Sequence, residues 1–305
     1  FSKLNRWYQE HFYEAHFTSA AGGLVRYCLS SGNGAKGIVV LVNGRTEFIE
    51  KYYDLMQELH EYGFSLGTYD HIGQGKSSRL LREPEKGHIS TFTHYVADLQ
   101  KMLQLIRSEK PGLPIYLVTH SMGGLIGAMH VSEEHHGIEK LVMSAPMLGI
   151  RTGRVMRPPV VKMISRLACL AGMQEAYVWG TGKHSPNRIF EHNALTTDKA
   201  RFTYNRSLIE RFPEVSLKGP TFGWLHSAFK GMKLARINSS KITLPVLVFQ
   251  AQYDRVVLPE PIEYLGRQAE NTQILKIPGA KHEMFMEQDA IRSEVIERML
   301  SFLCS

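Results

Sequence analysis

This 305-residue sequence lacks long apolar runs, has few cysteines that could pair and, in one segment, has few acidic residues. Its longest apolar runs, Gly37–Val42 and Val246–Phe249, have the length of a strand and fall short of the roughly 20 residues that a membrane-spanning helix needs. The three cysteines lie far apart without the spacing of metal ligands, and an odd number cannot form a complete disulfide framework. The sequence therefore predicts a cytoplasmic protein that does not span a bilayer.

Acidic residues are scarce between Leu148 and Ser240, where fifteen basic residues face five acidic ones. The whole chain has a net charge of +7, so the rest of it is slightly negative, and such an asymmetry indicates an anionic partner. No helix-turn-helix, zinc-finger or aromatic RNA-binding signature occurs, so nucleic acid is not the expected partner. An anionic lipid substrate, or peripheral contact with the inner membrane, is the alternative to ordinary solvated surface charge. The fifteen basic residues are Arg151, Arg154, Arg157, Lys162, Arg166, Lys183, Arg188, Lys199, Arg201, Arg206, Arg211, Lys218, Lys230, Lys233 and Arg236.

Strand-like and helix-like patterns alternate on both sides of this basic segment. The run Lys36–Val42, for example, predicts a strand buried on both faces. From residue 147 to 241 the sequence contains helical pieces but no buried strand run. We expect a mostly parallel sheet with helices on both faces, formed by residues 1–146 and 242–305, and a mainly helical cap inserted at 147–241. The predicted strands are 13–18, 24–29, 36–42, 64–69, 115–118, 140–144, 244–250 and 273–277, and the predicted helices are 52–61, 95–107, 122–133, 259–269 and 289–303.

Ser121 lies where the strand predicted over 115–118 gives way to a helix. Gly123 and Gly124 would let that helix pack closely on the strand, and the tight turn would expose the serine hydroxyl. The N-terminus of the helix would also favour a developing negative charge. This context is typical of a nucleophile elbow, although an isolated serine before a helix is often only an N-cap. Thr119 stands where the elbow usually has glycine, so we expect some crowding of the turn.

A serine nucleophile needs a base, and His282 is the histidine between the last predicted strand and the last helix. Asp254 follows the strand predicted over 244–250. The order serine, carboxylate, histidine is that of the α/β-hydrolase fold, and all three positions fall at carboxyl ends of strands. We therefore predict Ser121 as nucleophile, His282 as general base and Asp254 as the carboxylate that orients the histidine.

The segment Asn43–Glu47 directly follows the first buried strand. Acyl transfer needs two backbone N–H donors at the developing oxyanion, one from the residue after the nucleophile and one from this loop. We expect Met122 and Arg45 to supply them. The Arg45 side chain could reach a substrate phosphate, but extension into solvent is the default expectation. No metal ion or organic cofactor is implied by these residues.

Aromatic residues near the end of the expected cap form a candidate acyl-chain site. Phe222, Trp224 and Phe229 would line a groove beneath the cap. The alternative, given equal weight, is that these aromatics form the core of the cap itself.

Several motifs together carry a family resemblance. They are Asn43–Glu47, Asp70–Ser77, His120–Gly124, Lys281–Glu283 and Gly219–Trp224. With them the chain resembles the lysophospholipase L2 and monoacylglycerol lipase-like family of α/β-hydrolases. The resemblance implies the α/β-hydrolase fold, a lid over the active site, and hydrolysis of an acyl ester by Ser121, Asp254 and His282. We interpret Asp70–Ser77 as a structural turn, because it lacks the third glycine of a dinucleotide fingerprint.

The expected activity is two-step hydrolysis of fatty-acyl esters, with lysophospholipids as the first choice of substrate. A monoacylglycerol lipase or carboxylesterase would share every catalytic residue, and a proline-iminopeptidase-like enzyme would share most of them. A non-catalytic binding protein on the same scaffold is the alternative outside the enzymes, and the intact set of serine, aspartate and histidine argues against it.

Overall fold

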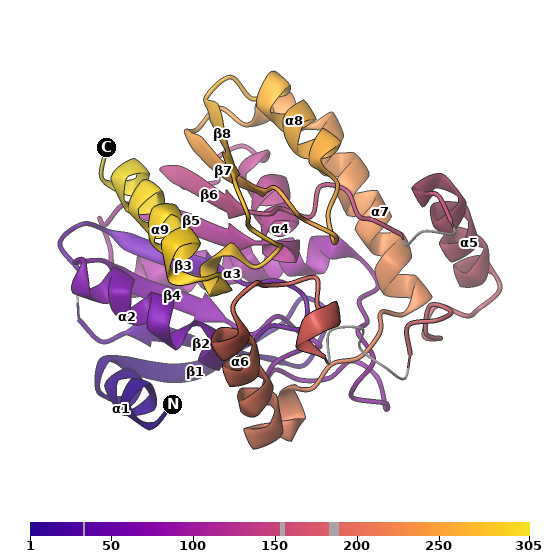
Figure 1. The fold of residues 1–305 in the computed structure, drawn as a ribbon, viewed down its shortest axis with the longest axis horizontal. Coiled ribbons are helices and arrows are strands. Elements are labelled where there is room, and N and C mark those ends of the chain that lie inside the picture. The colour runs from indigo at the N-terminus through magenta and orange to yellow at the C-terminus, as the bar shows by residue number, and fades with distance from the viewer. Residues whose placement is uncertain (33, 153–155, 183–188) are drawn as a thin grey trace.

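The computed structural model describes residues 1–32, 34–152, 156–182 and 189–305. Three of the basic residues counted above, Arg154, Lys183 and Arg188, lie outside the described residues. The strands of the described chain are β1 (Phe12–Thr18), β2 (Leu24–Ser30), β3 (Ile38–Val42), β4 (Ser65–Tyr69), β5 (Ile115–His120), β6 (Lys140–Ser144), β7 (Val246–Ala251) and β8 (Thr272–Ile277). These eight strands form one sheet in the order β1-β2-β4-β3-β5-β6-β7-β8 (Figure 1).

The sheet is antiparallel at one edge and parallel elsewhere. Strands β1 and β2 form an antiparallel hairpin, β2 pairs antiparallel with β4, and all remaining neighbours are parallel. Strands β3 and β5 are almost entirely buried, as central strands covered on both faces should be. The register pairs Val42 with Thr119 and His120 with Ser144. The loops that follow β3, β5 and β6 therefore leave the sheet side by side, at the edge where open α/β sheets bind ligands.

Helices cover both faces of this sheet (Figure 1). Helices α2 (Tyr53–Glu61) and α9 (Asp289–Cys304) lie on one face, where Arg292 of α9 pairs with Glu58 of α2 at 2.6 Å. No helix in the described ranges is both long and apolar enough to cross a membrane. The helices on the other face are α3 (Phe92–Glu109), α4 (Met122–Val131) and α8 (Pro259–Gln268).

The N-terminal helix α1 (Ser2–His11) is not predicted by the sequence pattern. Its residues are mostly polar, and Tyr8 is the one buried residue within it. The Tyr8 ring stacks on Tyr53 of α2 with 4.3 Å between the ring centroids. Leu4 and Trp7 are partly buried and pack on the same core as Tyr8, so α1 has one short apolar face. In a helix of ten mostly polar residues such a face is a weak sequence signal.

The segment between β6 and β7 contains, in its described part, helices and short 3-10 turns but no strand of the sheet. Helix α7 packs against α3, α4 and α8 as well as against α5. The predicted boundary at residue 241 thus separates helices that share one packed interface, and the division into core and cap stays a proposal. The helices of the segment are α5 (Pro158–Leu170), α6 (Lys199–Arg211) and α7 (Phe222–Ile237), and its 3-10 turns are η3 (Phe190–His192), η4 (Pro213–Val215) and η5 (Ser239–Lys241).

Candidate active site

Ser121 occupies the sharp turn between β5 and α4. Its backbone has φ 50° and ψ −113°, a conformation that residues other than glycine rarely adopt and that the surroundings must hold in place. The Ser121 N–H donates to the Ser144 carbonyl oxygen at 3.0 Å. Gly123 permits the close approach of α4, because a Cβ there would lie 2.0 Å from the Val42 carbonyl oxygen. The strained turn therefore holds the serine at the carboxyl end of β5.

Thr119 fits into this turn, and the expected crowding is not seen. Its hydroxyl donates to the Val142 carbonyl oxygen at 2.9 Å, so a buried polar group is satisfied. Its methyl group faces Gly127 of α4, where an added Cβ would lie 3.1 Å from Thr119 Cγ2. Because Gly127 has no side chain, α4 leaves room for Thr119 in β5.

The structure brings Ser121, His282 and Asp254 together in one hydrogen-bonded chain. His282 Nε2 lies 2.9 Å from Ser121 Oγ, and His282 Nδ1 lies 2.8 Å from Asp254 Oδ2. All three residues follow the carboxyl ends of strands, namely β5, β7 and β8. Ser121 and His282 are buried, and removal from water strengthens the electrostatic contacts between the three groups. Such a chain can remove a proton from the serine and stabilise the imidazolium that results.

The Asp254 carboxylate is held in a defined orientation. Its Oδ1 accepts hydrogen bonds from the backbone N–H groups of Val256 and Val257, at 2.7 and 2.9 Å. Burial alone would raise the pKa of Asp254, but the hydrogen bond and charge of His282 and these two N–H groups hold it below its ordinary value. Asp254 is therefore ionised at neutral pH, with Oδ2 directed at His282.

The two predicted oxyanion donors lie on neighbouring loops. Met122 is the first residue of α4, and Arg45 lies in the loop after β3, whose end is paired with the end of β5. In the described part of the chain, no hydrogen bond uses the backbone N–H of either residue. Both donors are thus available to an incoming oxyanion.

The Arg45 side chain does not extend into solvent, contrary to the default expectation. Its Nη2 donates to the Lys218 carbonyl oxygen, and its guanidinium carbon lies 5.3 Å from the centroid of the Trp224 ring. Burial lowers the pKa of Arg45 to about 10, which leaves the group charged at neutral pH. The residue is half-exposed as a whole, but its Nε is fully covered.

A buried cluster of charges lies beside the site. The Lys51 ammonium contacts Glu47, from the loop after β3, at 2.6 Å, and Glu283, which follows His282, at 2.8 Å. Although burial opposes the charge on each group, Lys51 lowers the pKa of Glu47 to about 2 and the two carboxylates raise the pKa of Lys51. The cluster therefore ties the loop of the predicted oxyanion donor to the loop that carries His282.

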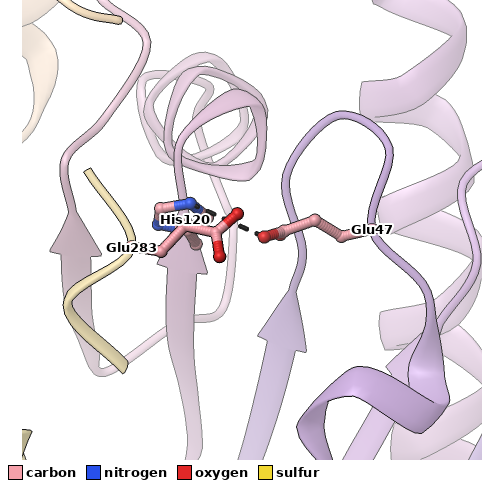
Figure 2. Close-up of side chains that lie close together, drawn as sticks. All are labelled: Glu47, His120 and Glu283. Carbon is pink, nitrogen blue, oxygen red and sulfur yellow. Dashed lines mark ion pairs between the residues drawn. The ribbon is translucent and has the colours of Figure 1, made fainter. Parts of the chain in front are cut away.

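His120 points towards the same two carboxylates (Figure 2). The ligand atoms of Glu47, His120 and Glu283 lie within 4.8 Å of one another, and such groups can bind metal ions. The Lys51 ammonium, however, already contacts both carboxylates and neutralises much of their charge. Burial lowers the pKa of His120 to about 4, so its ring is neutral at neutral pH. We interpret the group as an ion-pair cluster and assign no metal to it.

Lys51→Met is expected to destabilise the fold by about 3–5 kcal/mol, because it leaves two carboxylates buried without a counter-charge. Lowering the pH towards about 5 should recover part of the loss, since unpaired buried carboxyls have raised pKa values and the folded state then binds more protons. The measurement is the midpoint of thermal unfolding by circular dichroism. As a control, Lys276→Met removes the exposed partner of Glu263 and should leave the midpoint nearly unchanged. Equal midpoints for both variants would contradict a stabilising role of the cluster.

The aromatic residues predicted to line a groove are packed against other helices. Phe222, Trp224 and Phe229 are 1%, 5% and 8% exposed. Phe222 packs edge-on against Trp179, and Trp224 packs edge-on against Phe92 of α3. None of the three lines a cavity found among the described residues. A role in binding the acyl chain stays a prediction, and in this arrangement the three side chains hold α7 on its neighbours.

The Asp70–Ser77 motif forms a structural turn. The Asp70 carboxylate is fully buried and accepts hydrogen bonds from the N–H groups of Ile49 and Lys76, at 2.9 and 2.8 Å. Gly75 has φ 55°, and a Cβ there would lie 2.2 Å from the Asp70 carboxyl carbon. The Asp70 carboxylate thus already accepts hydrogen bonds from N–H groups at this turn. This agrees with the interpretation of the motif as structural.

A cavity of about 380 Å³ with both charged and apolar residues in its wall lies between the loop after β3 and the segment inserted after β6. It adjoins the site, because Arg45 is the predicted oxyanion donor and Glu283 directly follows His282. A larger hollow of about 930 Å³ lies near the far end of α4 and contains none of the predicted site residues. The charged residues in the wall of the smaller cavity are Arg45, Lys51, Arg201, Arg206, Lys218 and Glu283.

This chain is similar in sequence to proteins of a known family. A family model described as "Serine aminopeptidase, S33" matches residues 33–289. The chain belongs to this family. Its relatives include proteins named for activity on lipids, so the name of the family does not limit its members to aminopeptidases.

Two curated relatives cover almost the whole chain. A probable lysophospholipase L2 of Haemophilus influenzae is 31% identical over 278 residues, which cover 91% of this chain and 87% of that protein. Lysophospholipase L2 of Escherichia coli strain K12 is 30% identical over 300 residues, which cover 95% and 86%. The family resemblance inferred from the motifs is thereby confirmed.

Solved structures show the same fold. A monoglyceride lipase of Saccharomyces cerevisiae, crystallised with a substrate analog, aligns with a TM-score of 0.74, 22% identity and coverage of 96% of this chain and 95% of that one. A monoacylglycerol lipase of Paleococcus ferrophilus aligns with a TM-score of 0.69, 22% identity and coverage of 96% and 98%. The predicted α/β-hydrolase fold is confirmed.

Proposed function

We propose that this protein is a serine hydrolase of fatty-acyl esters that acts on lysophospholipids. The observation that carries the proposal is the hydrogen-bonded chain from Asp254 through His282 to Ser121, at the ligand-binding edge of the sheet. The names of the Haemophilus influenzae and Escherichia coli relatives support lysophospholipids as substrates.

The proposed reaction is acyl transfer in two steps. His282 Nε2 removes the proton of Ser121 as its Oγ attacks the ester carbonyl carbon, and Asp254 stabilises the imidazolium. The backbone N–H groups of Met122 and Arg45 bind the oxyanion of the tetrahedral intermediate. His282 then gives the proton to the leaving alcohol, and the acyl group remains on Ser121. In the second step His282 activates water, which releases the fatty acid and restores the serine.

The alternatives differ in substrate more than in chemistry. A monoacylglycerol lipase or carboxylesterase would use the same residues, and the name of the family points to cleavage of an aminoacyl amide. The excess of basic residues between Leu148 and Ser240 favours an anionic substrate over both neutral ones. A binding protein without activity would have no need of an aligned serine, histidine and aspartate.

The test combines a covalent probe with a substrate panel. A fluorophosphonate should label the wild-type protein at Ser121, and kcat/KM should be highest for a lysophospholipid among four substrates. The others are a monoacylglycerol, a short p-nitrophenyl ester and an aminoacyl amide. Absence of labelling would favour the binding protein, and a preference for the amide would overturn the assignment to lipid esters.

We also propose that α5 makes peripheral contact with an anionic membrane. An apolar stripe on this helix faces outwards, with exposed fractions between 42% and 74%. Exposed basic residues lie on this helix or directly before it, and a helix with this pattern can enter the interface of an anionic bilayer. The stripe consists of Val160, Met163, Leu167 and Leu170, and the basic residues are Arg157, Lys162 and Arg166.

Leu170→Ser is expected to weaken binding to vesicles that contain phosphatidylglycerol by about tenfold, because one buried leucine contributes roughly 1.5–3 kcal/mol. The wild type should sediment with these vesicles, less so at high salt, and hardly with pure phosphatidylcholine. Ile237→Ser, which changes an exposed apolar residue on α7, is the matched control. Equal sedimentation of the wild type with both kinds of vesicle would contradict the proposal.

A further inference from the structure

Arg45 is a cation that lacks a carboxylate partner. Within the described ranges, no Asp or Glu forms an ion pair with its guanidinium, and the buried Nε has no hydrogen-bond acceptor. Its Nη2 donates only to the neutral carbonyl oxygen of Lys218. Covering a charged group without an anionic partner is costly, so the arrangement suits a site that an anion completes.

A second unpaired cation faces the same cavity. Arg206 of α6 lines the wall, and it forms no ion pair with any other residue that the structure describes. The other cations in the wall of the cavity already form ion pairs with carboxylates. Lys51 contacts Glu47 and Glu283, Arg201 contacts Asp198 and Asp289, and Lys218 contacts Glu85. Two guanidinium groups are therefore left for a ligand.

The cavity lies beside the residues that would bind the ester of a lysophospholipid. Its wall includes Arg45, whose N–H is a proposed oxyanion donor, and Glu283, the neighbour of His282. An ester carbonyl bound at Ser121 would thus lie next to the cavity mouth. In a lysophospholipid the phosphate is separated from that carbonyl by one glycerol unit, so it can enter the cavity while the ester stays at the serine.

We propose that this cavity is the head-group site of the enzyme and that Arg45 and Arg206 bind the phosphate of a glycerophosphate ester. Guanidinium groups match phosphate because their N–H donors form a planar fork. The wall combines these cations with apolar residues such as Phe202 and Ile209, and its volume of about 380 Å³ is large enough for a glycerophosphate group. The inference rests on the proposed esterase activity, since it names the part of the substrate that this cavity binds.

The test compares two lipids with the same acyl chain, both below their micelle concentrations. The ratio of kcat/KM for lysophosphatidylglycerol to kcat/KM for monoacylglycerol should fall about ten- to hundredfold in Arg206→Met and in Arg45→Met, because each loses charge-assisted hydrogen bonds. Arg45→Met keeps its backbone N–H. Lys199→Met removes an exposed charge from the same helix as Arg206, outside the cavity, and should leave the ratio within about twofold. If Arg45→Met fails to fold, the ratio measured for Arg206→Met alone tests the proposal.

Glycerol 3-phosphate serves as a probe without an acyl chain. It should inhibit monoacylglycerol hydrolysis by the wild type and do so at least about tenfold more weakly in Arg206→Met. Inhibition by inorganic phosphate at the same concentration would instead identify a site for any free phosphate and overturn the head-group assignment. The head-group assignment is also overturned if folded Arg206→Met has the same ratio of kcat/KM for the two lipids as the wild type. In that case both proteins still hydrolyse esters. Failure of the proposed function would look different, because no ester would then be hydrolysed by the wild type.

Discussion

Ser121→Ala is expected to lower kcat/KM for every ester substrate by about 10⁴-fold or more. The variant lacks the Oγ atom that attacks the carbonyl and that donates its proton to His282 Nε2. Remaining activity would come only from binding and from the oxyanion donors. Fluorophosphonate labelling should vanish as well, because no nucleophile is left to react.

The fold should survive this change. Ser121 contributes one side-chain hydrogen bond, to His282, whose removal costs about 1 kcal/mol. Ser132→Ala, at the far end of the same helix, is a matched control, since its hydroxyl donates to the Met129 carbonyl oxygen away from the site. The measurements are initial rates and thermal melts of both variants beside the wild type. Activity of Ser121→Ala within tenfold of the wild type would rule out Ser121 as the nucleophile.

The central strands of the sheet could be predicted almost residue by residue because they are buried on both faces. A continuous apolar run, such as the one that ends at Val42, is typical of a strand in a parallel sheet that helices cover on both faces. The same logic fails for α1, which is mostly polar and packs on the core only through a short apolar face around Tyr8. The end of the insertion stays a prediction, because α7 packs on the insertion and on the core helices alike.

The three residues of the hydrogen-bonded chain could be predicted because each follows a recognisable strand. The charge cluster around Lys51 could not be predicted in the same way. Glu47 and Lys51 are four residues apart, but Glu283 reaches them only through the fold. The direction of the Arg45 side chain depends on Trp224 and on the Lys218 carbonyl oxygen, which are equally remote in the sequence. Sequence patterns report strand ends well and contacts between distant loops poorly.

Asp254→Asn is expected to lower kcat by about 10⁴-fold, through the protonation of His282 rather than through loss of its position. The two backbone N–H groups of Val256 and Val257 require an acceptor, so the amide oxygen of asparagine takes the place of Oδ1. Its NH₂ group then faces His282 Nδ1 and forces that nitrogen to accept a hydrogen bond. His282 Nε2 must in turn carry the proton, and it can no longer accept one from Ser121.

A second carboxylate provides the control for this prediction. Glu260 lies in the first turn of α8, only a few residues from Asp254 along the chain, and makes no ion pair with another described residue. Glu260→Gln should behave like a change on the surface, with kcat within about twofold of the wild type. Rates at saturating substrate, with thermal melts to exclude unfolding, measure both variants. A larger loss in Glu260→Gln than in Asp254→Asn would mean that the acid partner of His282 is Glu260, and that the contact of 2.8 Å between Asp254 and the imidazole is structural only.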